Sequence, residues 1–380
     1  MVKTVQSPKI AASLQPFVDR HVLAGAVVLV ASKTEVLSLD AVGQADLAAG
    51  LPMRTDCLFW IASTSKPMTA TALMMLVDEG KVNVEEPVER YLPEFKGQML
   101  AVEHDEDHTI LKKPARPITV RDILSHTSGL PFMSRVEQVI DARPLREAVV
   151  SYALTPLKSE PGAKYEYSNA GINTAGRIIE VISGLRYEQF MQQRLFTPLG
   201  MKDTTFFRGQ QQVARLAKCY KPNAAKTGLE ETTIDQLTYP LSAPGRHPCP
   251  AGGLFSTAAD VARFGQMILN GGQLDGRRYL CEAAVRQMTS TQTGPLLSQD
   301  GNEAGYGFGW STSRKDPGTG AAPAGACGHG GACGNQFSID PQQQRVLIFM
   351  VQHGGYPGDG DEAYPTFQKA AAQSFARSPC

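Results

Sequence analysis

The sequence predicts an α/β fold of the α+β type, in which an antiparallel sheet flanked by helices is built from both ends of the chain. Strand-like apolar runs occur near both ends of the 380 residues, whereas the middle carries mostly helical periodicity. We therefore expect an α/β lobe made of residues 1–62 and 301–380, and a mainly helical lobe over residues 63–300 inserted between them. A buried helix at the interface would join the two lobes into one unit.

The first elements follow from the spacing of apolar residues. A helix and then two strands joined by a short polar turn are expected near residues 9–22, 25–31 and 35–43. From Thr64 to about Glu79 the apolar residues recur with helical spacing, and Gly80 supplies a C-cap glycine. Residues 96–117 are charged and break this pattern, so we expect an exposed inserted loop there.

The middle of the chain predicts helices and the C-terminal part predicts strands. The expected helices lie near residues 119–125, 145–153, 171–184, 187–195, 258–270 and 282–289. The expected strands lie near residues 306–311, 326–330, 334–340 and 345–352. The last of these is almost continuously apolar, which predicts a central strand covered on both faces. A final helix near 362–376 is expected to pack beside the first, and the Gly/Pro/Ala-rich stretch 317–325 to form a surface loop.

One short motif offers a nucleophile and a base one helical turn apart. Ser63 and Lys66 are spaced so that they share a face of a helix, which places Lys66 Nζ within reach of Ser63 Oγ. Burial and the positive end of the helix dipole both disfavour an ammonium ion and lower the pKa of the lysine. The apolar flanks at 59–62 and 70–76 indicate that this helix is buried. The pair is therefore suited to acyl transfer.

Two later segments carry groups that such a site needs. The phenol of Tyr167, held near a lysine ammonium, can be driven toward phenolate and relay a proton, and Asn169 can point its amide at lysine and substrate. The glycines around His329 let a strand pass close to a ligand, as a backbone oxyanion donor requires. Alone, the tyrosine segment is equally compatible with a polar turn before a helix, and a glycine-rich strand is more often just a turn. The three motifs in this order, however, form a strong combined signal.

In this order the motifs Ser-x-x-Lys, Tyr-x-Asn and His-x-Gly resemble those of the penicillin-recognising serine hydrolases, which comprise serine β-lactamases, DD-peptidases and their esterase relatives. The resemblance covers nearly the whole chain and is nearest to the class C β-lactamase-like branch, including the family VIII carboxylesterases. Supporting phrases lie at residues 25–31, 124–130, 198–201 and 305–310. The resemblance implies a β-lactamase/transpeptidase-like fold with the active site in a cleft between the lobes.

The resemblance also implies roles for individual residues. Ser63 would be the nucleophile, Lys66 its general base, Tyr167 the second acid/base and Asn169 a substrate-orienting amide. An oxyanion hole would come from the backbone N–H groups of Ser63 and Ala332. The remaining expected substrate-binding residues are His329, Gly330 and Gly331, and Phe132, Tyr306 and Trp310 are candidates either for lining an acyl or alcohol pocket or for the core.

His329 departs from the pattern, because the β-lactamases and peptidases carry a lysine there. A lysine is a fixed cation suited to a substrate carboxylate, whereas a histidine near its reference pKa is mostly neutral at pH 7. Charged β-lactams should therefore be recognised less well, which favours a carboxylesterase without excluding slow β-lactam turnover. A purely local packing role for His329 is the alternative.

The composition is that of an ordinary soluble enzyme. Lys plus Arg and Asp plus Glu both number 37, so no net field favours nucleic acid or an anionic membrane surface. No run reaches the roughly 18 to 20 apolar residues that a spanning helix needs, and the first 25 residues contain no secretory signal. The chain as given is expected to be cytoplasmic, with a periplasmic or secreted protein as the alternative if a signal peptide was removed.

Cofactor chemistry is not expected. The sequence contains no Gly-x-Ser-x-Gly, His-Glu-x-x-His, Walker A or strand-linked Gly-x-Gly-x-x-Gly motif. The charged stretch 104–108 lacks hydrophobic support, so we expect no metal site there. The seven cysteines form no Cys-x-x-Cys pair and are expected to be mostly reduced, with a bond between Cys327 and Cys333 as the open alternative.

The sequence therefore predicts a serine carboxylesterase that cleaves small acyl esters through a Ser63 acyl-enzyme and needs no cofactor. The alternative within enzymes is a β-lactamase or D-amino-acid peptidase, for which lactam or amide turnover would exceed ester turnover. The alternative outside enzymes is a protein that only binds an acyl ligand. The presence of all four catalytic residue types argues against it. The sequence does not specify an oligomeric state.

Overall fold

The structure is a computed structural model that describes residues 8–105, 107–296, 305–313 and 325–375. Its helices are α1 (Pro8–Asp19), α2 (Ser65–Asp78), α3 (Val120–Leu124), α4 (Leu145–Leu154), α5 (Asn169–Ser183), α6 (Tyr187–Phe190), α7 (Thr197–Leu199), α8 (Gln210–Val213), α9 (Ala258–Leu269), α10 (Glu282–Thr289) and α11 (Ala363–Phe375). A π-helical segment, Met191–Phe196, connects α6 to α7. The predicted helices of the middle of the chain are therefore present, each shifted by only a few residues.

The strands form one large sheet and several small pairs. The large sheet contains β1 (Gly25–Ala31), β2 (Val36–Asp46), β3 (Leu51–Pro52), β12 (Gly305–Tyr306), β13 (Ser311–Thr312), β14 (Cys327–Gly330), β15 (Gln336–Asp340) and β16 (Arg345–Met350). The pairs are β4 (Phe59–Trp60) with β9 (Phe255–Ser256), β5 (Leu100–His104) with β6 (Thr109–Lys112), β7 (Cys219–Pro222) with β8 (Leu229–Thr232), and β10 (Gln273–Leu274) with β11 (Arg277–Arg278).

The large sheet joins the two ends of the chain, as predicted. Its order is β12-β13-β14-β15-β16-β1-β2-β3, and all its pairings are antiparallel. The C-terminal strand β16 pairs with the N-terminal strand β1, with Leu29 opposite Ile348. This confirms β16 as a central strand. The single strand expected near 306–311 is instead two short strands, because Gly309 turns the chain at a φ of 75°.

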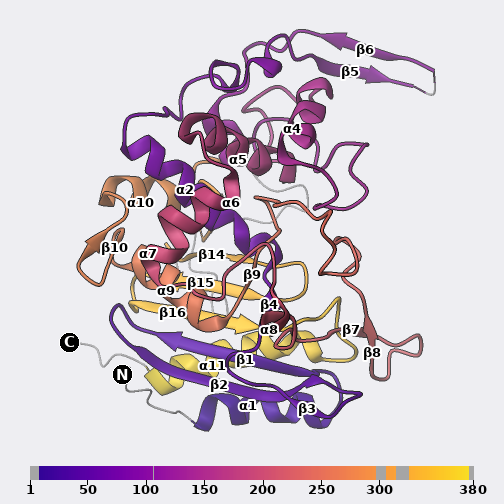
Figure 1. The fold of residues 1–380 in the computed structure, drawn as a ribbon, viewed down its shortest axis with the longest axis vertical. Helices are drawn as coiled ribbons and strands as arrows, with labels where there is room; N and C mark the ends of the chain where they lie inside the picture. Colours follow the sequence, from indigo (N-terminus) through magenta and orange to yellow (C-terminus); the bar gives the residue numbers. More distant parts are fainter. Residues whose placement is uncertain (1–7, 106, 297–304, 314–324, 376–380) are drawn as a thin grey trace.

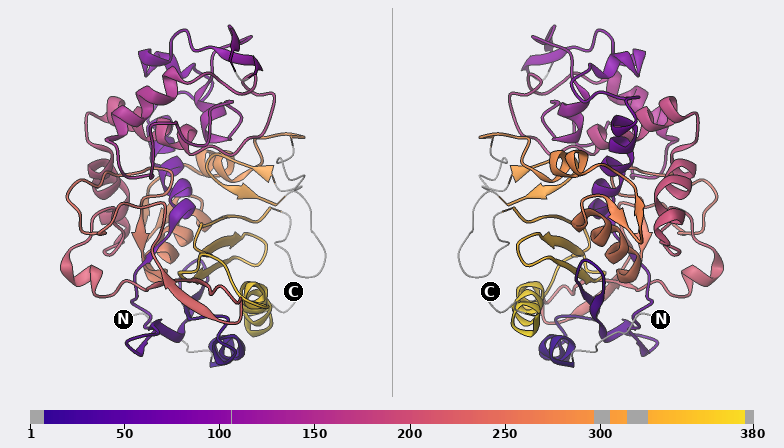
Figure 2. Two further views of the ribbon diagram at one scale, coloured as in Figure 1. Left: turned by 90° about the vertical axis from the view of Figure 1, so that its right-hand side faces the viewer. Right: turned by 90° about the vertical axis from the view of Figure 1, so that its left-hand side faces the viewer.

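Helices cover both faces of this sheet (Figure 1). Along β1, Val28 and Val30 pack with α1 and α11, whereas Val27 and Leu29 face the core on the side of α9. This alternation explains why β1 is apolar at every position, since neither face reaches water. The first and last helices lie side by side below the sheet, as the sequence predicts (Figures 1 and 2).

Helix α2 lies between the sheet and the helices of the middle of the chain (Figure 1). From Cys57 through Leu76 every residue is buried except Ser63. A helix that is buried on all sides is part of the core, so its position is fixed by packing rather than by one amphipathic face. The fold thus exposes one hydroxyl within an otherwise buried stretch of twenty positions.

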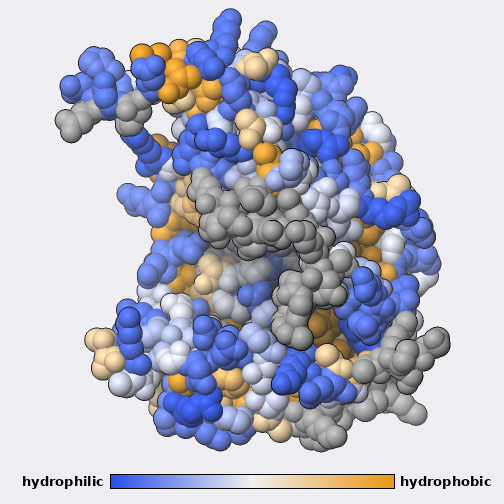
Figure 3. Space-filling view, turned by 180° about the vertical axis from the view of Figure 1, so that it is seen from behind, coloured by the Kyte–Doolittle hydropathy of each residue, from blue (hydrophilic) through white to orange (hydrophobic). Residues whose placement is uncertain are grey.

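The stretch 96–117 is exposed, but the prediction that it is an irregular loop is wrong. Strands β5 and β6 pair as an antiparallel hairpin that projects from the helical part of the molecule (Figures 1 and 3). The hairpin exposes Val102, Ile110 and Leu111, so it has no buried face whose alternation a sequence pattern would show. The small pairs β7–β8 and β10–β11 have strands of only four and two residues, too short for a periodic pattern to predict.

Three remaining expectations concern the cysteines, the stretch 317–325 and membrane-spanning helices. The six cysteines of the described residues are all free, so Cys327 and Cys333 are not bonded to each other. The stretch 317–325 lies outside the described residues except for Gly325. Within the described ranges, no helix combines the length and apolarity needed to cross a membrane.

Gly265 allows α9 to approach the sheet closely. A Cβ atom built on Gly265 would lie 2.6 Å from Val346 Cγ1 and 2.9 Å from Phe337 Cε2, which real side chains do not tolerate. We expect Gly265→Val to lower the free energy of unfolding by roughly 2–3 kcal/mol through overpacking, measured by urea denaturation. Gly245→Val is the matched control, because a Cβ there meets no atom within 4 Å. Equal losses in the two variants would contradict this packing argument.

Candidate active site

Ser63 lies in a short 3-10 turn, Ala62–Thr64, that leads directly into α2. Ala62 has a φ of 45°, a left-handed conformation that is costly for any residue other than glycine. Such strain persists only where the surroundings impose it, and it is common at active sites. Here the imposed turn presents the Ser63 hydroxyl at the surface of the core.

Lys66 is fully buried one turn after the serine. Its Nζ lies 3.0 Å from Ser63 Oγ and donates a hydrogen bond to the carbonyl oxygen of Ala251 at 2.8 Å. Burial disfavours the ammonium form and lowers the pKa of Lys66 to about 7. Near neutral pH a large share of Lys66 is therefore an amine, whose lone pair can accept the Ser63 proton.

The hydroxyl of Tyr167 lies 3.5 Å from His329 Nε2, and its interaction with the Ser63 side chain partly offsets the effect of burial on its pKa. Lys66 Nζ sits 4.7 Å from the centroid of the tyrosine ring. Burial raises the pKa of Tyr167 well above its ordinary value, which corrects the expectation that Tyr167 is driven toward phenolate. The burial that keeps Lys66 neutral also keeps the phenol protonated, so Tyr167 is a proton donor in this structure.

His329 lies at the end of β14 and is neutral. Its Nδ1 bonds the carbonyl oxygen of Gly330 at 2.7 Å, and a carbonyl can only accept, so Nδ1 carries the proton. The unprotonated Nε2 then accepts from the hydroxyl of Tyr306 at 3.0 Å. Burial lowers the pKa of His329 to about 3, so it supplies no positive charge at neutral pH.

The turn after β14 brings Ala332 toward the serine. A Cβ on Gly331 would lie 2.7 Å from the carbonyl oxygen of Ile61, so only glycine allows this close approach. Asn335 Nδ2 ties the turn to the carbonyl oxygen of Trp60 at 2.9 Å. Ala332 is exposed, and among the described hydrogen bonds its N–H has no acceptor. Its backbone donor therefore remains free for an oxyanion.

Asn169 is the first residue of α5, whose N-cap Ser168 accepts the N–H of Gly171 at 3.1 Å. The Asn169 side chain is buried, and in the described part of the chain its Oδ1 has no hydrogen-bond partner. Its backbone N–H donates to the carbonyl oxygen of Phe132 at 3.1 Å. The structure places Asn169 beside Tyr167, but no hydrogen bond between the Asn169 amide and Lys66 is present.

The aromatic candidates for the pocket have different positions. Phe132 is 44% exposed and stacks on Tyr167 with ring centroids 6.2 Å apart. Tyr306 is fully buried and lies behind His329, to which it is hydrogen-bonded. For Trp310 the core alternative holds, because its side chain is fully buried against Phe264 and another core phenylalanine, Phe337. Only Phe132 of the three therefore reaches solvent next to the motif residues.

Several supporting residues were not predicted. Ala251 contributes only its backbone carbonyl to Lys66, and the side chain of Asn173 holds that loop by accepting the N–H of Ala251 at 3.0 Å. Gln352 accepts the N–H of Trp60 at 3.0 Å and so fixes the strand before the serine. A backbone carbonyl such as that of Ala251 cannot be predicted from the type of residue. Asn173 could have been predicted, because it lies one turn after Asn169 in the same helix.

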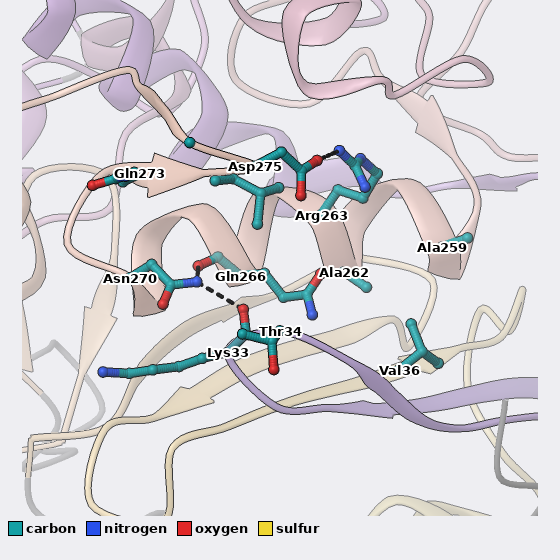
Figure 4. Close-up of a pocket in the computed structure, with 12 residues that line it drawn as sticks. Lys33, Thr34, Val36, Ala259, Ala262, Arg263, Gln266, Asn270, Gln273 and Asp275 are labelled. Carbon is teal, nitrogen blue, oxygen red and sulfur yellow. Dashed lines mark hydrogen bonds and ion pairs between the residues drawn. The ribbon is translucent and has the colours of Figure 1, made fainter. Parts of the chain in front are cut away.

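A cavity of about 670 Å³ lies elsewhere, between α9, the β1–β2 turn and β10 (Figure 4). None of the motif residues lines it. Its polar side chains are largely bound to the protein: Gln266 Nε2 donates to Ser32 O at 2.9 Å, and Asn270 Nδ2 donates to Lys33 O at 2.7 Å. This cavity has the size of a ligand site but none of the groups of the candidate active site.

The groups around Ser63 are an amine, a phenol and a neutral imidazole, which together support nucleophilic catalysis. Within the described ranges, no three His, Cys, Asp or Glu side chains gather closely enough to hold a metal ion. The chemistry that these residues can perform by themselves is activation of the serine, stabilisation of an oxyanion by backbone N–H groups and proton donation by the phenol.

The sequence and the fold are both similar to those of known proteins. A family model described as beta-lactamase matches residues 10–372. The chain is 32% identical over 371 residues to Protein Rv1367c of Mycobacterium tuberculosis (strain ATCC 25618 / H37Rv), covering 90% of this chain and 89% of that protein. It is 29% identical to Esterase EstB of Burkholderia gladioli, covering 88% and 87%.

Among solved structures, EstCE1, a hydrolase with promiscuous acyltransferase activity, matches with a TM-score of 0.79 at 22% identity, covering 96% of this chain and 97% of that chain. At this identity the likeness concerns the fold alone. The predicted architecture, an antiparallel sheet flanked by helices, is therefore confirmed over nearly the whole chain.

The buried lysine predicts a specific pH dependence. Below its pKa, Lys66 is an ammonium ion without a lone pair, so we expect kcat/KM for an acyl substrate to rise with pH through an apparent pKa near 7 and then level off. Burial lowers the pKa of both His126 and His329, so neither histidine accounts for an inflection there. The measurement is a pH–rate profile from 5.5 to 9, with background hydrolysis taken from Ser63→Ala. A flat profile would contradict a neutral-lysine base.

Proposed function

The chain belongs to the beta-lactamase family of serine hydrolases, and on that premise we propose that it cleaves carboxylic esters of small acyl groups through a Ser63 acyl-enzyme. The observation that carries this proposal is the Lys66 amine, buried and 3.0 Å from Ser63 Oγ. Burial of a lysine lowers the free energy of unfolding, so a buried lysine is often a functional residue. Here its role would be to accept the proton of Ser63. No cofactor enters the proposed reaction.

In the first half of the reaction, Lys66 takes the proton of Ser63 while Oγ attacks the ester carbonyl carbon. The negative oxygen that forms is held by the backbone N–H groups of Ser63 and Ala332, each worth roughly 10²–10³ in rate at comparable sites. Tyr167 then gives its proton to the leaving alkoxide, and the proton carried by Lys66 restores the phenol. The products are an alcohol and an acyl group bonded to Ser63 Oγ.

In the second half, water replaces the alcohol. Lys66 accepts a proton from the water molecule, the resulting hydroxide attacks the acyl carbon, and the Ser63–acyl bond breaks. Oγ leaves with the proton returned through Tyr167, so the carboxylic acid is released and Ser63 is regenerated. Asn169 is proposed to orient the bound acyl group. The α/β lobe of 1–62 and 301–380 and the helical lobe of 63–300 act as one catalytic unit in this scheme, because Ser63, Tyr167 and His329 come from both.

The neutral state of His329 supports esters over charged β-lactams. A carboxylate-bearing substrate gains from a fixed cation at this position, and His329, whose pKa is lowered to about 3, does not supply one. Gly330 and Gly331, beside it, serve close packing of the chain, because a Cβ there would lie 3.1 Å from Gln336 Oε1 and 2.7 Å from the Ile61 carbonyl oxygen. Relatives that carry the names of esterases, including EstB, add support for the same substrate class.

The direct test compares two acyl donors with one nucleophile variant. We expect the wild type to hydrolyse short p-nitrophenyl esters far faster than a chromogenic cephalosporin, and Ser63→Ala to lose at least about 10³-fold in kcat/KM. Ser290→Ala, at an exposed serine, is the matched control and should keep full activity.

The other outcomes distinguish the alternatives. Cephalosporin turnover above ester turnover would make the chain a β-lactamase, and D-amino-acid amide turnover above both would make it a peptidase. Failure to turn over any of the three, together with specific binding of an acyl ligand, would favour the non-enzymatic binding protein. An unchanged rate in Ser63→Ala would remove Ser63 from the mechanism.

Phe132 is proposed to bind the apolar part of the substrate at the entrance. Because its ring stacks on Tyr167 and is 44% exposed, Phe132→Ala should raise KM about tenfold for esters with longer or aromatic groups. Its kcat should stay within about threefold, since the variant removes apolar contact rather than a reacting group. Phe207→Ala, at a phenylalanine that is 46% exposed on another segment, is the matched control. Equal KM values for Phe132→Ala and wild type would contradict this role.

A further inference from the structure

We propose that His126, which lies outside the three motifs, is a positioning residue that holds the hydroxyl of Tyr167 against Ser63. The inference rests on the proposed part of Tyr167 in acyl transfer and deepens it, because it assigns a function to a residue of the phrase at 124–130. His126 directly follows α3 and Ser125, in a segment that packs against the N-terminal end of α5.

His126 ties down the chain on both sides of the tyrosine. Its backbone carbonyl oxygen accepts the N–H of Glu166 at 2.8 Å, and its ring Nδ1 accepts the N–H of Ser168 at 3.1 Å. Tyr167 is therefore held between two hydrogen bonds that end on one histidine. Rotation of the Tyr167 backbone would break at least one of them.

The ring of His126 also packs directly on the tyrosine. Its centroid is 4.4 Å from the centroid of Tyr167 and 4.4 Å from that of Tyr306. Tyr306 in turn donates to His329 Nε2, which lies 3.5 Å from the Tyr167 hydroxyl. His126 thus lies at the centre of a buried aromatic cluster. Its ring packs on the ring of Tyr167 and on Tyr306, and its hydrogen bonds hold the two residues that flank Tyr167.

The hydrogen bond from the Ser168 N–H determines which ring nitrogen of His126 carries the proton. Since Nδ1 accepts, the ring proton is on Nε2. Burial lowers the pKa of His126, and Lys66 and His329 disfavour its charge further, so the ring stays neutral and Nδ1 stays an acceptor. A protonated ring would lose the bond to Ser168 and place a second cation beside Lys66.

Two unfavourable features coincide at His126. Its φ is 59°, a left-handed conformation that is costly for a residue with a side chain, and its Nε2 is buried without a partner among the described residues. A residue chosen only for stability would avoid both. Unfavourable conformations and unpartnered polar atoms that persist are more often found at functional sites, which is consistent with a positioning role.

The test is a double-mutant cycle between His126 and Tyr167. We expect His126→Ala to lower kcat about 10- to 100-fold with KM changed less than about threefold, because a misplaced group affects the reaction more than binding. In a Tyr167→Phe background the same change should cost less than about threefold, since no hydroxyl remains to be positioned. His126→Asn should recover much of the loss, because Asn Oδ1 can accept the Ser168 N–H and asparagine tolerates the left-handed backbone.

His353 provides the matched structural control. It is a second buried histidine that accepts a backbone N–H, that of Ala24, at 3.2 Å through a ring nitrogen. His353→Ala should lower thermal stability about as much as His126→Ala but leave kcat within about threefold. Equal losses of kcat in the two variants would mean that His126 only supports the fold, and would overturn the proposal.

Two further results would also overturn it: a His126→Ala loss that is equally large with and without the Tyr167 hydroxyl, or a change in KM alone. The cycle can be measured as the rate at which a fluorophosphonate probe labels Ser63. In this step Lys66 takes the Oγ proton, Oγ bonds to phosphorus, and fluoride leaves with the Tyr167 proton, which Lys66 then restores. Normal labelling without ester hydrolysis would refute the proposed ester activity and still decide the cycle, so the two failures are distinguishable. A wild type that is not labelled would overturn both.

Discussion

The structure depends on one constraint, the burial of the Lys66 amine against Ser63. Removal from water is what makes a lysine a base at neutral pH, and only a helix packed on all sides can provide it at this position. Helix α2 is therefore enclosed by the sheet on one side and by α5 and α10 on the other. The fold thus excludes water from the Lys66 amine and leaves the Ser63 hydroxyl accessible.

The same burial has a different effect on each neighbouring group. It lowers the pKa values of Lys66 and His329, which favours their neutral, deprotonated forms. It raises the pKa of Tyr167, so the phenol keeps its proton. A lysine that is charged in water and a histidine that titrates near neutral pH thus become an amine and a neutral imidazole, while the phenol keeps its proton. Opposite tasks, accepting and donating a proton, follow from a single environment because each group is neutral in a different protonation state.

Positioning of these groups is costly for the fold. The left-handed conformations of Ala62 and His126 cost about 1–3 kcal/mol each, and a buried Nε2 without a partner adds to this. The surrounding core offsets these costs through close contacts such as that of Gly265 with the sheet. Backbone strain and an unpartnered polar atom therefore lie next to Ser63 and Tyr167. Such features are typical of proteins that keep the positions of active-site groups at the expense of stability.

The sequence by itself determined the elements and the order of the motifs. Helical spacing and apolar strands are local properties, so α2, α5, α9 and the strand β16 could be predicted, as could the proximity of Ser63 and Lys66 on one helix turn. Strands at both ends of the chain predicted a shared sheet, but the pairing of β1 with β16 is a tertiary contact. Tertiary structure alone decided what depends on contacts between distant segments: the protonation of Tyr167, the tautomer of His329, the Ala251 carbonyl on Lys66 and the core position of Trp310. The physical reason is that burial and hydrogen-bond partners are supplied by residues far apart in the chain, and no local pattern records them.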